Sequence, residues 1–205
     1  KDSFSLGAGK GGYLAFLGRT SPEKGLDQAI EIAKRAEMPL KIAAKIDRVD
    51  VQYFETIIKP LLDHPLIEFI GEIGYPEKNT FLGNAAGLLF PINWREPFGL
   101  VMIEAMACGT PVIAYPLGSV PEVMEEGVTG FMVPGLEGAV NAVKNLGEIH
   151  RGKCRGHFEQ YFNAERMAND YLNIYQRLIL GEPPSISVSD GVLSCTKMAA
   201  HNSTT

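Results

Sequence analysis

The sequence of 205 residues is poor in cysteine and has no recognisable metal-binding cluster. Its three cysteines, Cys108, Cys154 and Cys195, are odd in number and lack C-x-x-C spacing. This pattern disfavours a disulfide framework and a zinc site, and it favours a reducing compartment. The loops hold no Asp-x-Asp run, and Asp47-Arg48-Val49-Asp50 is better explained as a helix cap. We therefore expect neither a metal site nor another cofactor.

The sequence also lacks a strong charge of one sign and any long apolar run. Its formal net charge of −5 gives no basic signal, so we expect no nucleic-acid partner. No apolar stretch is long enough to span a bilayer, and no secretory signal opens the chain. We expect a cytoplasmic protein, with peripheral contact at the inner face of the membrane left open. Hydrophobic residues make up 45% and charged residues 21%, which is the composition of an ordinary globular domain.

Short apolar runs alternate with helical patterns along most of the chain. Strands are expected near residues 13–17, 40–44, 67–71, 87–91, 111–115 and 130–133. Helices are expected after Pro22, in a short piece at 118–122, from Asn163 on, and over 51–62, 77–85, 98–108 and 137–146. This alternation predicts an α/β fold with a doubly wound, mostly parallel, Rossmann-like sheet. Such sheets bind ligands at the carboxyl ends of their strands.

Composition divides the chain into three parts. Residues 1–12 are polar and glycine-rich, 13–180 hold the α/β pattern, and 181–205 contain Pro and many Ser and Thr without periodicity. The glycines of 7–12 fit G-x-G-x-x-G but precede a strand, which favours a linker over a dinucleotide-binding loop. Because the chain begins at Lys1, we expect a piece of a longer protein, with 181–205 as a flexible or non-native tail.

The stretch that follows the fourth expected strand combines carboxylates with an apolar helix. Residues 98–108 should be buried on all sides, and Glu104 is the one side chain among them that is charged at neutral pH. Gly109 suits the left-handed residue that ends a helix. The first amides of this helix would form an anion site between Glu104 and the loop carboxylate of Glu96. A ligand with phosphate and sugar hydroxyls would satisfy these groups; the alternative is a helix cap at Glu96 and a buried pair of Glu104 with an Arg or Lys.

Two cations follow the first expected strand. Arg19 and Lys24 lie on the loop before the next helix, where Ser21 and Pro22 form a helix-start signal. They could hold a diphosphate, Arg by its fork of donors and Lys as a point charge. The alternative is that both are solvated surface charges.

In their order along the chain, these residues resemble a known family. Glu96, seven residues and Glu104, with Pro97-Phe98-Gly99-Leu100 between them, resemble the signature of the retaining family-4 glycosyltransferases of the GT-B type. Other blocks resemble that family at the expected spacing: Gly18-Arg19, Glu23-Lys24-Gly25, Glu104 to Val112, Gly118 to Glu122, and Gly127 to Phe131. The resemblance runs from about Tyr13 to Leu180. Ala44-Lys45-Ile46-Asp47 departs from the family's usual glycine-rich turn, and Lys45 could supply a contact to the base there.

The resemblance implies a C-terminal, donor-binding domain that works with an N-terminal acceptor domain absent from this chain. Arg19 and Lys24 would hold the diphosphate of a nucleotide sugar. Glu104 would accept hydrogen bonds from the ribose and Glu96 from the transferred sugar. The implied catalytic residues are Glu96, Arg19 and Lys24. The implied donor-binding residues are Gly18, Arg19, Lys24, Ile73, Glu96, Phe98, Gly99, Leu100 and Glu104. Among these, Ile73 would lie near the base, and Phe98, Gly99 and Leu100 would act through their amides.

The implied reaction moves a sugar from a UDP- or GDP-sugar to a glycan, lipid or small-molecule acceptor, as in polysaccharide biosynthesis. The resemblance also implies retention of anomeric configuration and independence of metal ions. We expect the chain alone to fold and bind nucleotide but not to turn over, because half of the cleft is missing. Two alternatives stay open: a nucleotide-sugar epimerase of the GT-B type and a non-catalytic nucleotide-binding module.

Overall fold

The computed structural model describes residues 4–181, 187–189 and 192–194 of the chain. Its main element is a six-stranded sheet with the order β3-β2-β1-β4-β5-β6, in which every neighbouring pair is parallel. The strands are β1 Leu14–Arg19, β2 Leu40–Lys45, β3 Ile67–Gly71, β4 Gly87–Phe90, β5 Val112–Ala114 and β6 Gly130–Met132. The chain runs outward from β1 to β3 and then returns to β4 beside β1. This confirms the predicted doubly wound sheet and places its topological switch point between β1 and β4.

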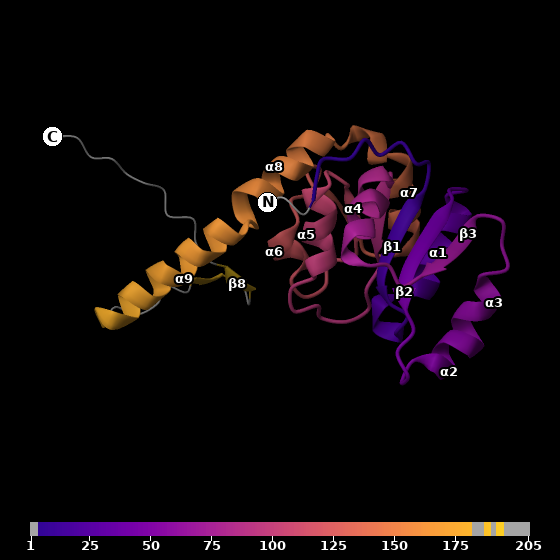
Figure 1. The fold of residues 1–205 in the computed structure, drawn as a ribbon, viewed down its shortest axis with the longest axis horizontal. Helices are drawn as coiled ribbons and strands as arrows, with labels where there is room; N and C mark the ends of the chain where they lie inside the picture. Colours follow the sequence, from indigo (N-terminus) through magenta and orange to yellow (C-terminus); the bar gives the residue numbers. More distant parts are fainter. Residues whose placement is uncertain (1–3, 182–186, 190–191, 195–205) are drawn as a thin grey trace. The chain divides into compact units, whose positions relative to one another are not determined.

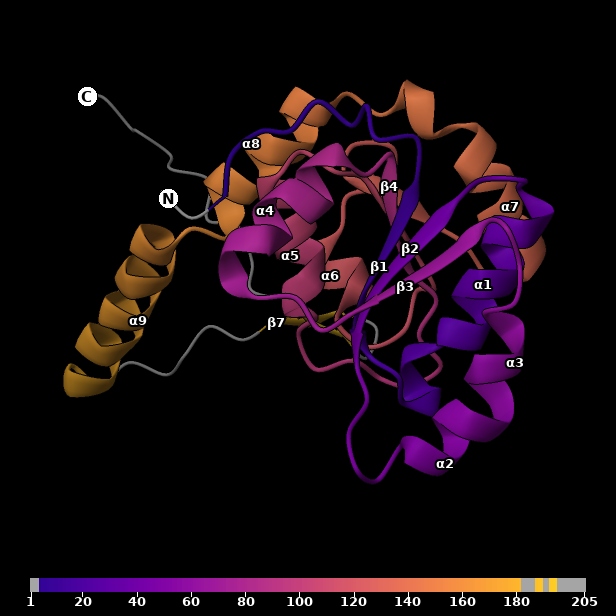
Figure 2. The ribbon, with the colours of Figure 1, turned by 45° about the vertical axis from the view of Figure 1, so that its right-hand side comes forward.

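Helices cover both faces of the sheet (Figures 1 and 2). Helices α1 (Leu26–Arg35) and α7 (Leu136–Lys144) pack on one face, and α4 (Tyr75–Asn84), α5 (Leu100–Ala107) and the short α6 (Val120–Val123) pack on the other. Successive residues of β1 alternate between the two cores: Ala15 faces α4 and α5, whereas Leu14 and Phe16 face α1 and α7. The central strands β4 and β5 are likewise buried on both sides, as the continuous hydrophobic runs predicted, whereas the edge strand β3 has exposed residues at alternate positions.

The predicted helix over 51–62 is present but irregular. It consists of α2 (Val51–Tyr53), a π-helical turn η2 (Phe54–Ile58) and α3 (Lys59–Leu61). Pro60 lies in its last turn and has no N–H to donate, and its ring would crowd the carbonyl four residues earlier in a regular helix. A π-helical turn just before a proline gives that ring more room.

Helix α5 begins two residues later than the apolar pattern predicted. Gly99 has a φ of 77°, in the left-handed region, so Phe98 lies outside the helix and α5 starts at Leu100. Gly109 ends it with a φ of 68°, as predicted. The expectation that this helix is buried on all sides is wrong, because Leu100 is 65% exposed. The exposed first turn opens onto the groove described below.

The sequence analysis missed helix α8 (Arg151–Tyr161). Two glycines and five charged or His residues interrupt its apolar pattern, and only Cys154 of this helix is buried. The helix is held instead by arginines. The Arg151 guanidinium donates to the carbonyls of Gly7, Gly83, Ala85 and Cys108 and to the Thr110 hydroxyl, over 2.8–3.2 Å. Arg155 donates to the carbonyls of Phe4, at 2.8 Å, and Ala107.

Residues 4–12 run along the surface of this domain rather than away from it. The amides of Gly7, Gly9 and Gly11 donate to the carbonyls of Cys108, Gly83 and Asn84 at 2.9–3.0 Å. These glycines thus precede β1 and bind protein backbone, in agreement with the argument against a dinucleotide-binding loop. Their role as a linker to a further domain stays a prediction.

Residues 164–205 form a second compact unit, which we describe by itself. Its helix α9 (Ala164–Ile179) is amphipathic and exposes an apolar stripe along its length: Met167, Tyr171, Leu172, Ile174, Tyr175, Leu178 and Ile179. Two short strands, β7 (Ser187–Ser189) and β8 (Val192–Ser194), pair antiparallel inside the predicted tail 181–205. The rest of that tail after Gly181 lies outside the described residues, and its flexible or non-native character stays a prediction.

Candidate functional site

An open groove lies at the carboxyl ends of β1 and β4, at the switch point of the sheet. It consists of two adjoining pockets of about 280 and 360 Å³ that share Leu17, Gly18, Leu100 and Val101. The first pocket continues past Glu104 toward Lys45, Glu72, Ile73 and Lys78. The second continues past Arg19, Lys24 and Glu96 along Pro97, Phe98 and Gly99. All nine residues predicted to bind or act on the donor therefore line one groove.

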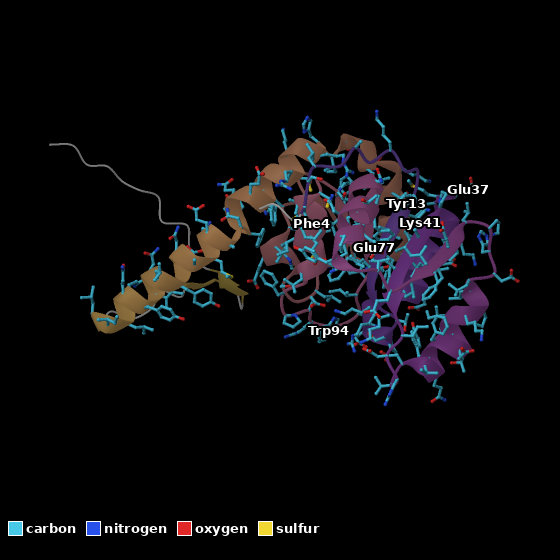
Figure 3. The ribbon with its side chains drawn as sticks, in the orientation of Figure 1. Phe4, Tyr13, Glu37, Lys41, Glu77 and Trp94 are labelled. Carbon is cyan, nitrogen blue, oxygen red and sulfur yellow. The ribbon has the colours of Figure 1, made fainter. Side chains whose placement is uncertain are left out.

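Lys24 and Glu96 form an ion pair at one end of this groove. The Lys24 Nζ lies 2.6 Å from Glu96 Oε2, and the two side chains are only 19% and 10% exposed. Trp94 completes the cluster: its indole Nε1–H donates to the same carboxylate oxygen at 3.0 Å, and its ring lies 4.9 Å from the Lys24 ammonium. Figure 3 shows Trp94 at the end of the sheet opposite to Tyr13 and Lys41, which mark the amino ends of β1 and β2.

Lys78 and Glu104 form a second ion pair at the other end. Lys78 Nζ, from α4, donates to both carboxylate oxygens of Glu104, from α5, at 2.9 and 3.2 Å. The side chains are 26% and 18% exposed. The alternative considered from the sequence, a lysine paired with Glu104, is therefore present. It does not exclude a ligand, because the pair lies on the wall of the first pocket.

Arg19 is held by two carboxylates and is more exposed than Lys24. Its guanidinium lies 2.8 Å from Glu23 Oε1 and 3.5 Å from Asp47 Oδ2, and 45% of the side chain is exposed. Lys45 Nζ also reaches Asp47, at 3.0 Å. The hydrogen bond from Lys45 lowers the pKa of the Asp47 carboxyl. The same contact, with Glu72 nearby, raises the pKa of Lys45.

The helix-start signal at Ser21 and Pro22 is only partly confirmed. These residues begin the single 3₁₀ turn η1 (Pro22–Lys24), after which Gly25 interrupts the helix with a φ of 67°. Helix α1 then starts at Leu26. The turn places Lys24 beside Glu96, because the Glu23 carbonyl accepts the Asn93 amide at 3.1 Å and joins this loop to the one after β4.

Helix α5 points its amino terminus into the groove between the two ion pairs. Its first amides have no carbonyl of an earlier turn to bind, and the helix dipole is positive at this end. Gly118 fixes the approach to the helix, because it packs so closely on the backbone of Arg95 and Glu96 that a Cβ there would overlap it. The Ser119 amide also donates to the Glu96 carbonyl at 2.9 Å. The Gly118 loop thus supports the position of Glu96.

Sequence reasoning missed two members of the site, Lys78 and Trp94. Neither belongs to the motifs by which the groove was predicted, and each reaches its glutamate through the fold. Trp94 is the one tryptophan of the chain and precedes Glu96 by two residues, a signal that could have drawn attention to it. Lys78 carries no comparable signal. Among the described residues, no three His, Cys, Asp or Glu side chains come together in a way that could hold a metal ion.

Comparison with known proteins identifies the family. A family model described as "Glycosyl transferases group 1" matches residues 1–148. The chain belongs to this glycosyltransferase family. It is 31% identical over 170 residues to an uncharacterized 41.2 kDa protein in the cps region of Klebsiella pneumoniae, a match that covers 80% of this chain and 46% of that protein. It is 33% identical over 138 residues to the D-inositol 3-phosphate glycosyltransferase of Mycobacterium leprae, a match that covers 61% of this chain and 30% of that protein.

The chain thus spans less than half the length of these relatives. Solved structures agree with the fold. AviGT4, a glycosyltransferase involved in avilamycin A biosynthesis, superposes with a TM-score of 0.72 at 27% identity, covering 84% of this chain and 53% of that one. The UDP complex of Anabaena HepE has a TM-score of 0.69 at 20% identity, covering 80% and 48%, and shows the shared fold alone. The chain is therefore a Rossmann-like α/β domain of the GT-B type.

Proposed function

We propose that this group 1 glycosyltransferase domain binds a nucleotide diphosphate sugar in the groove and donates its sugar within a longer, retaining enzyme of family 4. The observation that supports this most directly is the order of groups along the groove. The carboxylate of Glu104 lies in the first pocket, the start of α5 is shared by both pockets, and Arg19, Lys24 and Glu96 lie together in the second. A nucleoside, a diphosphate and a sugar present complementary groups in the same order.

The first pocket suits the nucleoside. Glu104 would accept hydrogen bonds from the two ribose hydroxyls, because a carboxylate has two oxygens with open acceptor positions. Ile73 and Leu17 provide apolar surface for the base, and Lys45, Lys78 and Glu72 provide polar groups beside it. The HepE complexes contain UDP, or UDP-glucose, and so support a nucleotide sugar as the ligand class.

The second pocket suits the diphosphate and the sugar, between which the bond breaks. Cleavage between the sugar and the diphosphate builds negative charge on the leaving phosphate, and preorganised donors stabilise such charge most effectively. Arg19, Lys24 and the amides of Gly99 and Leu100 at the start of α5 would supply such donors, and metal independence is part of the proposal. Glu96 would orient the sugar through its hydroxyls. Retention of configuration, with the acceptor attacking on the donor's own face, follows from the family resemblance and is part of the proposal.

The acceptor would bind to a further domain of the longer protein, and it would be a glycan, a lipid or a small molecule. The match to longer relatives, of which this chain covers less than half, supports a longer protein. Among the described residues, no helix is long and apolar enough to cross a membrane. We propose a cytoplasmic enzyme, which would work at the inner face of the membrane if its acceptor is a lipid.

The proposal is tested by titrating the chain with UDP, GDP and 2′-deoxy-UDP in a calorimeter. We expect binding of UDP or GDP, weaker binding of the deoxy form, and loss of this preference in Glu104→Ala. Glu148→Ala, an exposed carboxylate change outside the groove, is the matched control. A chain that binds neither diphosphate, or a Glu104→Ala variant with unchanged affinities, contradicts the proposal.

A further inference from the structure

Trp94 stands behind the charged end of the groove rather than in it. The residues that line the second pocket include Lys24 and Glu96 but not Trp94. The indole, 37% exposed, nevertheless contacts both of these side chains. Trp94 can therefore act on a ligand in this pocket through its contacts with Lys24 and Glu96.

The two contacts restrain two different groups. The indole N–H donates to Glu96 Oε2 at 3.0 Å. This hydrogen bond to a charged acceptor restrains the orientation of the carboxylate. The face of the ring lies 4.9 Å from the Lys24 ammonium, within the range of a cation–π interaction. One side chain thus orients both Glu96, which we predict to bind the sugar, and Lys24, which we predict to bind the phosphate.

The geometry also decides which atoms stay available. Lys24 and Trp94 both bind Oε2 of Glu96, so neither contact occupies Oε1. The ammonium of Lys24 has three N–H donors, and one of them is used by Glu96. A sugar hydroxyl can therefore approach Oε1 while a phosphate oxygen takes a remaining N–H of Lys24.

We infer that Trp94 is a positioning residue that holds Lys24 toward the diphosphate and Glu96 toward the sugar. The inference rests on the proposed function and adds a residue that neither the family signature nor the groove lining includes. The two contacts have different functions: the ring positions Lys24 for the diphosphate, and the N–H positions Glu96 for the sugar.

Two substitutions distinguish these contacts. Trp94→Phe keeps an aromatic face for Lys24 and removes the N–H, whereas Trp94→Leu removes both. The chain and its variants are titrated with UMP, UDP and UDP-glucose and with GMP, GDP and GDP-mannose, and their melting temperatures are recorded. Lys41→Met is the matched control, because Lys41 lies 5.1 Å from the Tyr13 ring and so makes a cation–π contact away from the groove.

We expect Trp94→Leu to weaken binding of the preferred diphosphate about two- to fivefold and to leave the monophosphate unchanged. Trp94→Phe should keep the affinity for the diphosphate within about twofold and lower that for the nucleotide sugar about threefold or more. Lys41→Met should change none of these affinities.

Equal affinities in all variants overturn the inference, and so does a parallel loss for mono- and diphosphate that follows the melting temperature, since that pattern indicates a purely structural role. If the unsubstituted chain binds UDP or GDP but Trp94→Phe and Trp94→Leu do not differ in their affinities for diphosphate and nucleotide sugar, the inference alone is overturned. Failure of the unsubstituted chain to bind either diphosphate overturns the proposed function, and the inference with it.

Discussion

Lys78 of α4 and Glu104 of α5 are joined by two hydrogen bonds, at 2.9 and 3.2 Å, across the helices that cover one face of the sheet. The pair mirrors Lys24 and Glu96 at the other end of the groove. Each glutamate of the E-x₇-E signature thus has a lysine partner from a distant part of the chain. The charged side chains that line the groove therefore largely neutralise one another.

The Lys78–Glu104 pair should contribute modestly to stability. We expect Lys78→Met and Glu104→Gln each to lower the free energy of unfolding, with a coupling of about 0.5–1 kcal/mol between them, because the pair is only partly buried. Urea unfolding of the two single variants and the double variant measures this coupling. A coupling of zero would mean that solvent screens the pair completely.

Lys24 and Arg19, the two side chains predicted to bind the diphosphate, should contribute unequally to its affinity. Lys24 is 19% exposed and Arg19 is 45% exposed, so water competes more effectively for Arg19. We expect Lys24→Met to weaken binding of the nucleoside diphosphate by about 1.5–3 kcal/mol and Arg19→Ala by about 1 kcal/mol. Calorimetric titration with UDP and GDP measures both, with Lys41→Met as the control. A larger loss from Arg19 than from Lys24 would contradict this ranking.

Gly118 should be intolerant of any side chain. It has a φ of 62°, and a Cβ at this position would overlap the backbone of Arg95 and Glu96. We expect Gly118→Ala to cost about 2–4 kcal/mol, the sum of a left-handed alanine and an overpacked contact. Gly127 is the control: it has a φ of 72° but open space around it, so Gly127→Ala should cost about 1–2 kcal/mol. Similar melting temperatures for the two variants would show that the contact with Glu96 adjusts.

Stability should fall at alkaline pH through the buried thiols. Burial raises the pKa of Cys108 to about 11 and that of Cys154 to about 12, from an ordinary value of 9.0. The folded state keeps these thiols protonated while the unfolded chain ionises them. Their stabilisation is therefore complete below pH 9 and is lost as the pH rises toward 11 and 12. We expect a shallower alkaline fall in Cys154→Ala, measured as the free energy of unfolding between pH 8 and about 11; identical slopes would contradict this.

The sequence predicted the fold well where the signal is local. Most of the six strands are short runs of buried apolar residues, and their alternation with helices determines the doubly wound sheet almost without further information. The groove could be predicted for a related reason: Arg19 ends β1, Lys24 follows it, and Glu96 and Glu104 follow β4. Parallel strands bring their carboxyl ends to one edge.

What could not be predicted depends on tertiary partners. Helix α8 has little apolar periodicity because Arg151 and Arg155 attach it through carbonyl groups of other segments. Lys78 reaches Glu104 only because α4 and α5 pack side by side. The exposure of Leu100 has the same origin, since an apolar residue that faces a ligand groove cannot be distinguished in sequence from one in the core.

Arg151 also affects the groove, although it lies at the far end of α5. It donates to the Cys108 carbonyl, and Arg155 donates to that of Ala107, so two guanidinium groups cover the last carbonyls of the helix whose first amides face the groove. An eight-residue helix is about 12 Å long, and its negative pole would otherwise partly cancel the field of its positive pole. Because the two guanidinium groups lie at the negative pole, that pole offsets less of the positive potential that the first amides of α5 direct at the groove.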